Sequence, residues 1–372
     1  MVHVATRGDS RARVSRVPAS GAEVLSMAQR WVVVVLMLTC GCALSRAGSL
    51  HMPPDQDEAL VWPAPPERPR IRFVQELTGP DDLGWRAGFW HGVVGWLAGS
   101  SSQERFVRPT GVAAAEGMLW VADPGAQSLW MFDRQRRRAR RIQRAGTTLL
   151  VSPVAVAIGP HRSAFLVDSS LAVVIAYDAA GRMRHTIAAP GFLRPSGVAY
   201  DLSRDRLYVA DSGAHVIWVL TGQGEARGAL GRRGAEPGEF NFPTHLALDP
   251  SGGLSVTDAL GFRIQRFTPA GAFAGQFGRH GDASGDLASP KGLAVDGDGR
   301  VYVVDALFDT VQIFDASGRL LLNFGQRGSD RGAFWLPNGL CLEDGARIYV
   351  ADAYNQRVQV FELLDADQSA PR

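Results

Sequence analysis

A sequence repeat with a period of 42 to 48 residues runs through most of this 372-residue chain, and it constrains the possible folds more than any other feature. Its first marker is the motif Pro-x-Gly-(Val/Leu)-Ala or a close variant, which begins at Pro109, Pro153, Pro195, Pro243, Pro290 and Pro337. Its second marker is an Asp at the end of an apolar run, which recurs as Asp123, Asp168, Asp211, Asp258, Asp305 and Asp352. Two independent markers with one period indicate six copies of one structural unit.

Each unit holds four short runs with the composition of β-strands. In the fifth unit these runs cover residues 292–295, 301–304, 311–314 and 320–324, and they are separated by turns rich in Gly and Asp. Neighbouring runs joined by short turns form an antiparallel sheet, and both faces of the inner strands are apolar. A closed ring of such sheets buries those faces. The sequence therefore predicts an all-β fold, a six-bladed β-propeller of four-stranded antiparallel blades.

The sixth unit ends without a fourth strand. Residues 70–77, which precede the first unit, form an isolated run of strand-like composition. We therefore expect this segment to be the outer strand of the sixth blade, so that an N-terminal strand closes the ring and leaves no long free sheet edge.

The repeated motifs resemble those of the NHL repeat family of six-bladed propellers. The resemblance rests on Pro-x-Gly-Val-Ala, on Leu-Tyr-Val-Ala-Asp and on the run Asn355-Gln-Arg357-Val-Gln-Val-Phe361, and it covers about residues 70–362. It implies the same fold. The family includes RNA-binding modules, a zinc-dependent amidating lyase and many bacterial envelope proteins, so the resemblance leaves the function open.

Residues 1–41 are predicted to be a signal peptide whose true start is Met27. The apolar run 31–38 follows a positive charge and is too short to span a bilayer as a helix, which needs about 20 residues. Gly41 and Cys42 then resemble the end of a bacterial lipobox, in which a Cys after a small residue is lipidated. The pattern predicts a lipoprotein anchored in the membrane of a bacterial cell envelope and facing the periplasm or the exterior. Simple cleavage and release, or a short uncleaved anchor, are the alternatives.

Other segments flank or interrupt the repeats. Residues 42–69 are rich in Pro and are predicted to be a lipid-anchored tether, residues 70–364 the propeller, and residues 365–372 a C-terminal tail. An inserted segment at 81–104 carries apolar residues at helical spacing from residue 85 to residue 98. As a short amphipathic helix it would cap the propeller, or alternatively lie on the membrane or on a partner.

The charge distribution argues against nucleic acid as a partner. Residues 1–41 hold five of the 39 basic and two of the 37 acidic residues, so the rest of the chain is nearly neutral. Seven arginines nevertheless gather within residues 134–144 of the first unit. An anionic lipid or glycan surface is one explanation for this run. An outer hairpin exposed to water is the other, and it is the one we favour.

The antiparallel pairing of the first two strands places the start of the first and the end of the second at one end of the ring. The residue after each motif Pro is therefore expected at one mouth of the central channel. Five of these six residues are polar, and Val154 is the exception. We predict that a ligand- or partner-binding site lies there, formed by Thr110, Ser196, His215, Thr244, His245, Lys291 and Asn338. An envelope protein or a small-molecule, peptide or glycan ligand would bind; polarity due only to exposure to water is the alternative.

No catalytic residue, metal site or cofactor is predicted. The six Asp residues are expected to accept backbone N–H bonds in the following turn rather than to bind a cation. His245 replaces the motif Gly and lies near His215, but a zinc site needs three converging ligands. Cys341 occupies a place held by Ala in other units, which predicts an inert thiol. The alternative function is a metal-dependent lyase or hydrolase with its site at the channel mouth.

Overall fold

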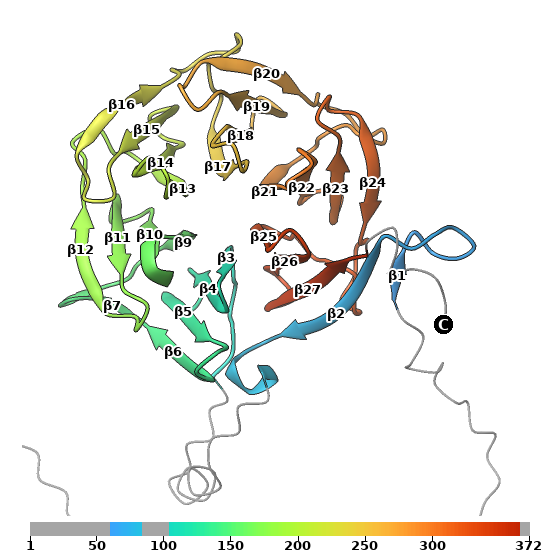
Figure 1. Ribbon diagram of the computed structural model, residues 1–372, viewed down its shortest axis with the longest axis horizontal. Helices are drawn as coiled ribbons and strands as arrows, with labels where there is room; N and C mark the ends of the chain where they lie inside the picture. Colours follow the sequence, from blue (N-terminus) through green and yellow to red (C-terminus); the bar gives the residue numbers. More distant parts are fainter. Residues whose placement is uncertain (1–59, 84–103, 365–372) are drawn as a thin grey trace, which may run out of the picture. The chain divides into compact units, whose positions relative to one another are not determined.

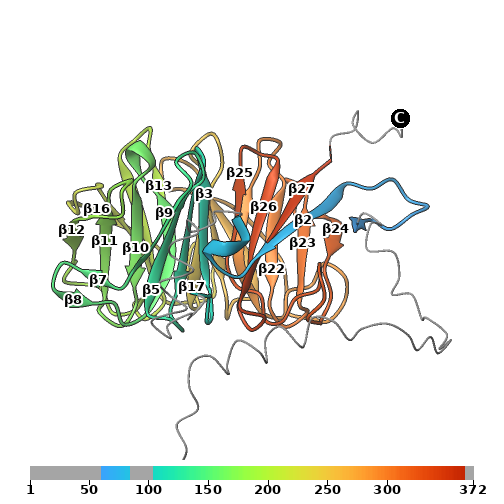
Figure 2. The ribbon, with the colours of Figure 1, turned by 90° about the horizontal axis from the view of Figure 1, so that it is seen from below.

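The computed structural model describes residues 60–83 and 104–364. Within them, six antiparallel sheets stand around a central axis as the blades of a propeller (Figures 1 and 2). The order of strands in each blade follows the chain from the axis outward, except in the sixth blade. This arrangement confirms the predicted all-β fold and the predicted number of blades.

The strands recur at the predicted places in every unit. The first strands, next to the axis, are β3 (Gly111–Ala115), β9 (Pro153–Ile158), β13 (Pro195–Asp201), β17 (Pro243–Leu248), β21 (Pro290–Val295) and β25 (Leu340–Glu343). The second strands are β4 (Met118–Asp123), β10 (Ala164–Asp168), β14 (Arg206–Asp211), β18 (Leu254–Asp258), β22 (Val301–Asp305) and β26 (Arg347–Asp352). The third are β5 (Ser128–Asp133), β11 (Val173–Tyr177), β15 (Val216–Leu220), β19 (Arg263–Phe267), β23 (Thr310–Phe314) and β27 (Arg357–Leu363). The fourth strands of the first five blades are β6 (Arg138–Ile142), β12 (Met183–Ile187), β16 (Ala226–Leu230), β20 (Phe273–Phe277) and β24 (Leu320–Phe324).

The sixth blade is closed by the N-terminal strand, as predicted. Strand β2 (Ile71–Leu77) pairs antiparallel with β27, in a register that runs from Ile71 opposite Leu363 to Leu77 opposite Val358. The two ends of the propeller are therefore joined within one sheet. The outward edge of β27 is therefore paired and is not left free at this point.

One further strand continues the sixth blade outward. Strand β1 (Val61–Trp62) pairs with β2, and the ring of Trp62 lies 5.9 Å from that of Phe324 and 5.7 Å from that of Phe361. The last ten residues of the predicted tether, 60–69, are thus part of the propeller. The pairing of β1 could not be predicted from the composition of this segment, because a single Trp among prolines gives no strand pattern.

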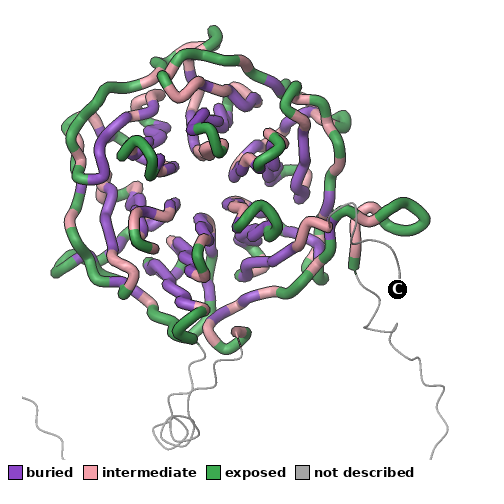
Figure 3. Tube along the Cα trace, viewed as in Figure 1, coloured by how far each residue is buried: buried purple, intermediate pink, exposed green. Residues whose placement is uncertain are grey.

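Apolar residues between adjacent blades form the core. The second strands are buried along nearly their whole length. The fourth strands are exposed or half-buried along most of their length, and in four of the five only the last residue is buried. Figure 3 shows this change from the buried inner strands to the mostly exposed fourth strands. Packing of this kind positions the six inner strands around the channel.

Small elements complete the described residues. Strands β7 (Arg144–Ala145) and β8 (Thr148–Leu149) form a hairpin, and two short 3-10 helices, η1 (Pro80–Leu83) and η2 (Pro160–Arg162), lie in loops. None of the helices in the described residues is long and apolar enough to cross a membrane. The predicted signal peptide, most of the tether, residues 84–103 of the insertion and the C-terminal tail lie outside the described residues.

Candidate functional site

The Asp at the end of each second strand anchors the loop that precedes the first strand. The carboxylate of Asp123 accepts hydrogen bonds from the amides of Val107 and Arg108 at 2.8 and 2.9 Å, and from that of Ala126 at 3.0 Å. In every other blade the same Asp accepts from the residue two before the motif Pro, namely Val151, Leu193, Asn241, Ala288 and Trp335, at 2.6 to 2.8 Å. The predicted structural role of the Asp ring is confirmed.

This anchoring fixes the side chains of one end of the propeller, which we call the motif face. It consists of the loops before the first strands and the loops between second and third strands. Seven of the fourteen large apolar side chains that are exposed in the described residues lie in these loops, with 42% to 66% of their surface accessible. We call them the apolar rim: Val107, Val151, Leu193, Leu260, Leu307, Trp335 and Tyr354. Four lie two residues before a motif Pro and three lie two residues after the strand-ending Asp.

The central channel below the motif face is narrow and mostly apolar. Its cavity measures about 350 Å³ and is lined by the six first strands. Its wall consists of Gly and aliphatic residues except for Tyr200, His245 and Cys341. Burial raises the pKa of the Cys341 thiol far above its usual range. A thiol that stays protonated is a poor nucleophile, in keeping with the inert role expected for Cys341.

His245 connects two blades across the channel. Its Nε2 lies 3.1 Å from Oδ1 of Asn338, and its Nδ1 lies 3.2 Å from Oγ1 of Thr244. Burial, followed by the nearby charge of Lys291, lowers the pKa of His245 to about 4. The imidazole is therefore neutral at pH 7 and links strand β17 to the segment before β25.

Lys291 lies between these two blades and is the one Lys in the sequence. Burial lowers the pKa of its ammonium group. No hydrogen bond or ion pair of this group is found among the residues that the structure describes. The charge of Asp305 offsets part of the effect of burial without forming an ion pair with Lys291. A shielded cation with no direct ionic contact, beside a neutral His245, favours a ligand that carries a carboxylate or another anionic group.

The structure brings together only part of the predicted site. Thr244, His245, Lys291 and Asn338 form one group. The hydroxyl of Thr110 instead donates to the carbonyl of Val154 at 3.0 Å, and that of Ser196 lies 3.3 and 3.2 Å from the carbonyls of Ala210 and Pro243. These two hydroxyls join neighbouring strands and blades.

His215 has a structural contact on the motif face. Its Nδ1 accepts the amide of Phe242 at 3.1 Å, and its own φ of 57° is left-handed. Asp309 has the same conformation two blades on and accepts the amide of Leu336 at 2.6 Å. Gln127, at the same position of the first blade, also has a left-handed φ, and its Nε2 lies 3.5 Å from the carbonyl oxygen of Val151. The position thus supports the loop before the next blade.

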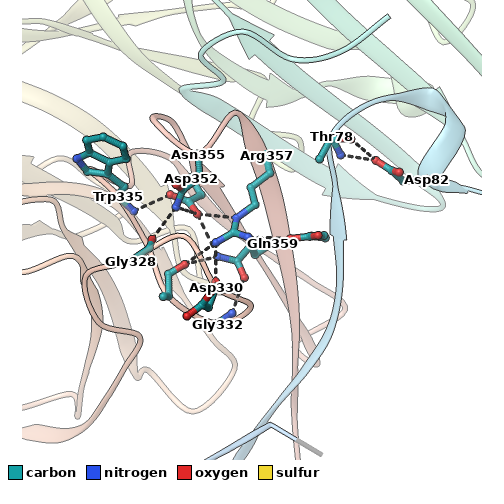
Figure 4. A network of polar contacts seen from close by, with 12 residues as sticks. Thr78, Asp82, Gly328, Asp330, Gly332, Trp335, Asp352, Asn355, Arg357 and Gln359 are labelled. Carbon is teal, nitrogen blue, oxygen red and sulfur yellow. Dashed lines mark hydrogen bonds and ion pairs between the residues drawn. The ribbon is translucent and has the colours of Figure 1, made fainter. Parts of the chain in front are cut away.

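The run Asn355-Gln-Arg357 also holds loops rather than forming a pocket. Arg357 donates from Nε to Asp352 at 2.8 Å, from Nη1 to Glu76 of β2 at 2.8 Å, and from Nη2 to the carbonyls of Asp330 and Ala333 (Figure 4). Its counterpart in the fourth blade, Arg263, makes the same kind of contacts. Both are buried.

A metal centre finds no support in the side chains. Within residues 60–83 and 104–364, no three His, Cys, Asp or Glu side chains gather in a way that could hold a metal ion. The carboxylates of the Asp ring are occupied by backbone amides, as described above. Among the described residues, the group at the mouth offers one imidazole, one amide oxygen and one hydroxyl, and the positive charge of Lys291 nearby disfavours a bound cation.

The pH dependence of stability tests the position of His245. Between the folded pKa of about 4 and the ordinary value of 6.5, the unfolded chain binds the extra proton. The contribution of neutral His245 is therefore full above pH 6.5 and is lost as the pH falls through this window. Urea unfolding at pH 7 and pH 4 should show this additional loss in the wild type and not in His245→Gln. Parallel pH profiles of the two proteins would contradict a buried neutral imidazole.

Comparisons with known proteins agree with this geometry. The NHL repeat family matches residues 192–220 and 334–361. Virginiamycin B lyase from Staphylococcus aureus is similar in structure, with 14% identity, a TM-score of 0.52 and coverage of 69% of this chain and 96% of the lyase. A gluconolactonase from Xanthomonas campestris has 16% identity, a TM-score of 0.54 and coverage of 87% and 100%. A comparison with curated protein sequences gives no match. At these identities the structural likeness shows the fold alone.

Proposed function

We propose that this chain, which is an NHL-repeat β-propeller, is an exported, lipid-anchored scaffold that binds a polypeptide partner of the bacterial cell envelope through its motif face. The apolar rim is the observation that carries the proposal. Soluble monomers seldom gather large exposed apolar side chains on one face, and such patches commonly mark interaction sites. Buried Asp residues already hold the loops that carry the rim. Binding therefore does not require these loops to lose much conformational entropy.

The chemistry of the mouth indicates what the partner presents. Leu307, Trp335 and Tyr354 offer apolar and aromatic contact area, which commonly dominates the free energy of protein binding. Lys291 favours a carboxylate, from an acidic side chain or a chain end, close to the centre of the contact. The partner is therefore a polypeptide with apolar residues around an acidic group.

The alternative function, a metal-dependent lyase or hydrolase, requires converging ligands and an open coordination position. The described part of the channel offers one His, and its two nitrogens lie near Thr244 and Asn338. Two of the structural relatives are named as lyase and lactonase, and those activities are theirs. Binding is the function that the geometry supports best.

The export and anchoring part of the proposal rests on the sequence before the propeller. Cys42→Ser should release the protein from the membrane fraction or leave its signal peptide uncleaved, because lipidation of this Cys would precede processing. Fractionation and intact-mass analysis of the mature protein check this. Cys40→Ser serves as the control and should leave both properties unchanged. Unaltered mass and membrane retention in Cys42→Ser would contradict the anchor.

Affinity capture with the wild type and with variants, followed by quantification of the proteins recovered by each, tests the binding surface. The full-length protein is used to recover partners from envelope extracts of the source cells, alongside Leu307→Asp and Lys291→Ala. Leu202→Asp is the matched control, since Leu202 is as exposed as Leu307 but lies in a loop at the opposite end of the propeller. A partner reduced at least about 10-fold by the first two variants and retained by the control supports the proposal, since a central contact contributes about 2 kcal/mol. Equal recovery with all variants would count against it.

A further inference from the structure

The arginine-rich hairpin of the first blade contains two kinds of Arg. Some serve the fold: Arg134 donates to Oη of Tyr349 at 2.8 Å, and the guanidinium of Arg141 lies 5.3 Å from the ring centre of Trp130. Arg144 donates a hydrogen bond from Nη1 to the carbonyl of Thr147 in the adjoining turn, at 2.9 Å. The other four arginines of the run are Arg136, Arg137, Arg138 and Arg140, of which Arg136 and Arg140 also make one side-chain contact each within the fold. The sequence alone could not separate the two groups, because it shows only one dense run.

These four arginines line one cavity of about 820 Å³ at the outer side of the first two blades. The opposite wall comes from the second blade: His161 of η2 and the turn of residues 178–180 between β11 and β12. Arg140 donates to the carbonyl of Ala180 at 2.9 Å, which joins the two walls at one point. The cavity is separate from the channel and from the motif face, since it lies beside the loops of the far end.

Acidic groups balance only part of this charge. Asp133 accepts hydrogen bonds at 2.8 Å from Arg136 and from Arg162. Partial burial would raise the pKa of Asp133, but these contacts outweigh it and lower the pKa to about 2. Asp178 accepts the amides of the turn that it begins. Arg137, Arg138 and Arg140 therefore have no carboxylate partner among the described residues.

We propose that this cavity binds a phosphate-bearing ligand. Guanidinium groups bind the oxygens of phosphate in a bidentate manner, and several of them together favour a dianion over a single carboxylate. The volume lies within the usual range of about 300–1,000 Å³ for small-molecule sites. A soluble phosphate ester and the headgroup of an anionic phospholipid present the same chemistry, and the test has an arm for each.

The first arm is calorimetric titration of the full-length protein with inorganic pyrophosphate at low ionic strength. Arg137→Gln with Arg138→Gln should weaken binding at least about 10-fold, because it removes two guanidinium groups that could form charge-assisted hydrogen bonds to the phosphate oxygens. The control is Arg327→Gln with Arg331→Gln, which removes the same charge from exposed arginines at the motif face. It should change the affinity less than about 3-fold, as expected of screened charges remote from the ligand. Circular dichroism should show both variants folded.

The second arm is co-sedimentation with phosphatidylcholine vesicles with and without phosphatidic acid. A headgroup site predicts that phosphatidic acid increases binding in the wild type and that the cavity variant loses this increase. Loss of pyrophosphate binding without any effect on vesicles identifies a soluble ligand. The proposal is overturned if the wild type binds neither probe, or if the control variant loses as much affinity as the cavity variant.

Discussion

Deleting residues 70–77 should unfold the propeller or cause it to aggregate. This deletion removes β2, whose Ile71 and Leu77 are fully buried, and it leaves the apolar edge of β27 without a partner. The ring then has no closure between its first and last blades. We expect a loss comparable with the whole free energy of unfolding of an ordinary domain, about 5–15 kcal/mol. Thermal unfolding followed by circular dichroism, together with size-exclusion chromatography, measures it.

Deletion of residues 43–59 is the control for this experiment. It removes a longer segment but ends before β1, so the pairing of β1, β2 and β27 stays intact. The melting temperature should be unchanged. Equal melting temperatures for the two deletions would contradict closure by the N-terminal strand.

Arg357→Met should cost about 3–5 kcal/mol of stability, which is typical of breaking a buried ion pair by removing one partner. Arg357 is the shared partner of Asp352 in its own blade, Glu76 in β2 and two loop carbonyls. Burial already raises the pKa of Asp352 despite its hydrogen bonds. Without Arg357, the charge of Asp352 would be buried without its ion-pair partner. Urea unfolding of the full-length protein gives the difference.

Two matched variants separate this buried network from a general effect of charge. Arg227→Met removes an exposed Arg that is paired with exposed Glu225, and it should cost no more than about 1 kcal/mol. Arg357→Met with Asp352→Asn should recover part of the loss, because the unpaired buried charge is gone. If Arg357→Met were as stable as Arg227→Met, the network of Figure 4 would not be a stabilising one.

The architecture could be predicted from the sequence because it depends on patterns that repeat. The Pro and Asp markers recur six times, and a missing strand at one end matches an isolated strand at the other. The closure of the ring by residues 70–77 could be predicted from this match between the missing strand and the isolated strand alone. The packing of Trp62 could not be predicted in the same way, because it occurs once and its partners, Phe324 and Phe361, lie far away in the sequence.

The candidate site was predicted less completely, for two physical reasons. Polarity of a residue does not tell where its hydroxyl points: Thr110 and Ser196 reach carbonyls of neighbouring strands, so they are satisfied within the fold. Single apolar residues in loops carry no signal either. The apolar rim emerges only when positions two before each motif Pro and two after each strand-ending Asp are compared across all repeats, and when the ring brings them together.

Site-specific photo-crosslinking in the source cells tests the central claim, that the motif face is the binding surface, most directly. A photoreactive amino acid is placed at Leu307 on the apolar rim or at Leu202 at the opposite end, two positions of similar exposure. We predict a defined crosslinked adduct to one polypeptide from position 307, reduced by Lys291→Ala, and none from position 202. An adduct from position 202 and none from position 307 would contradict the account.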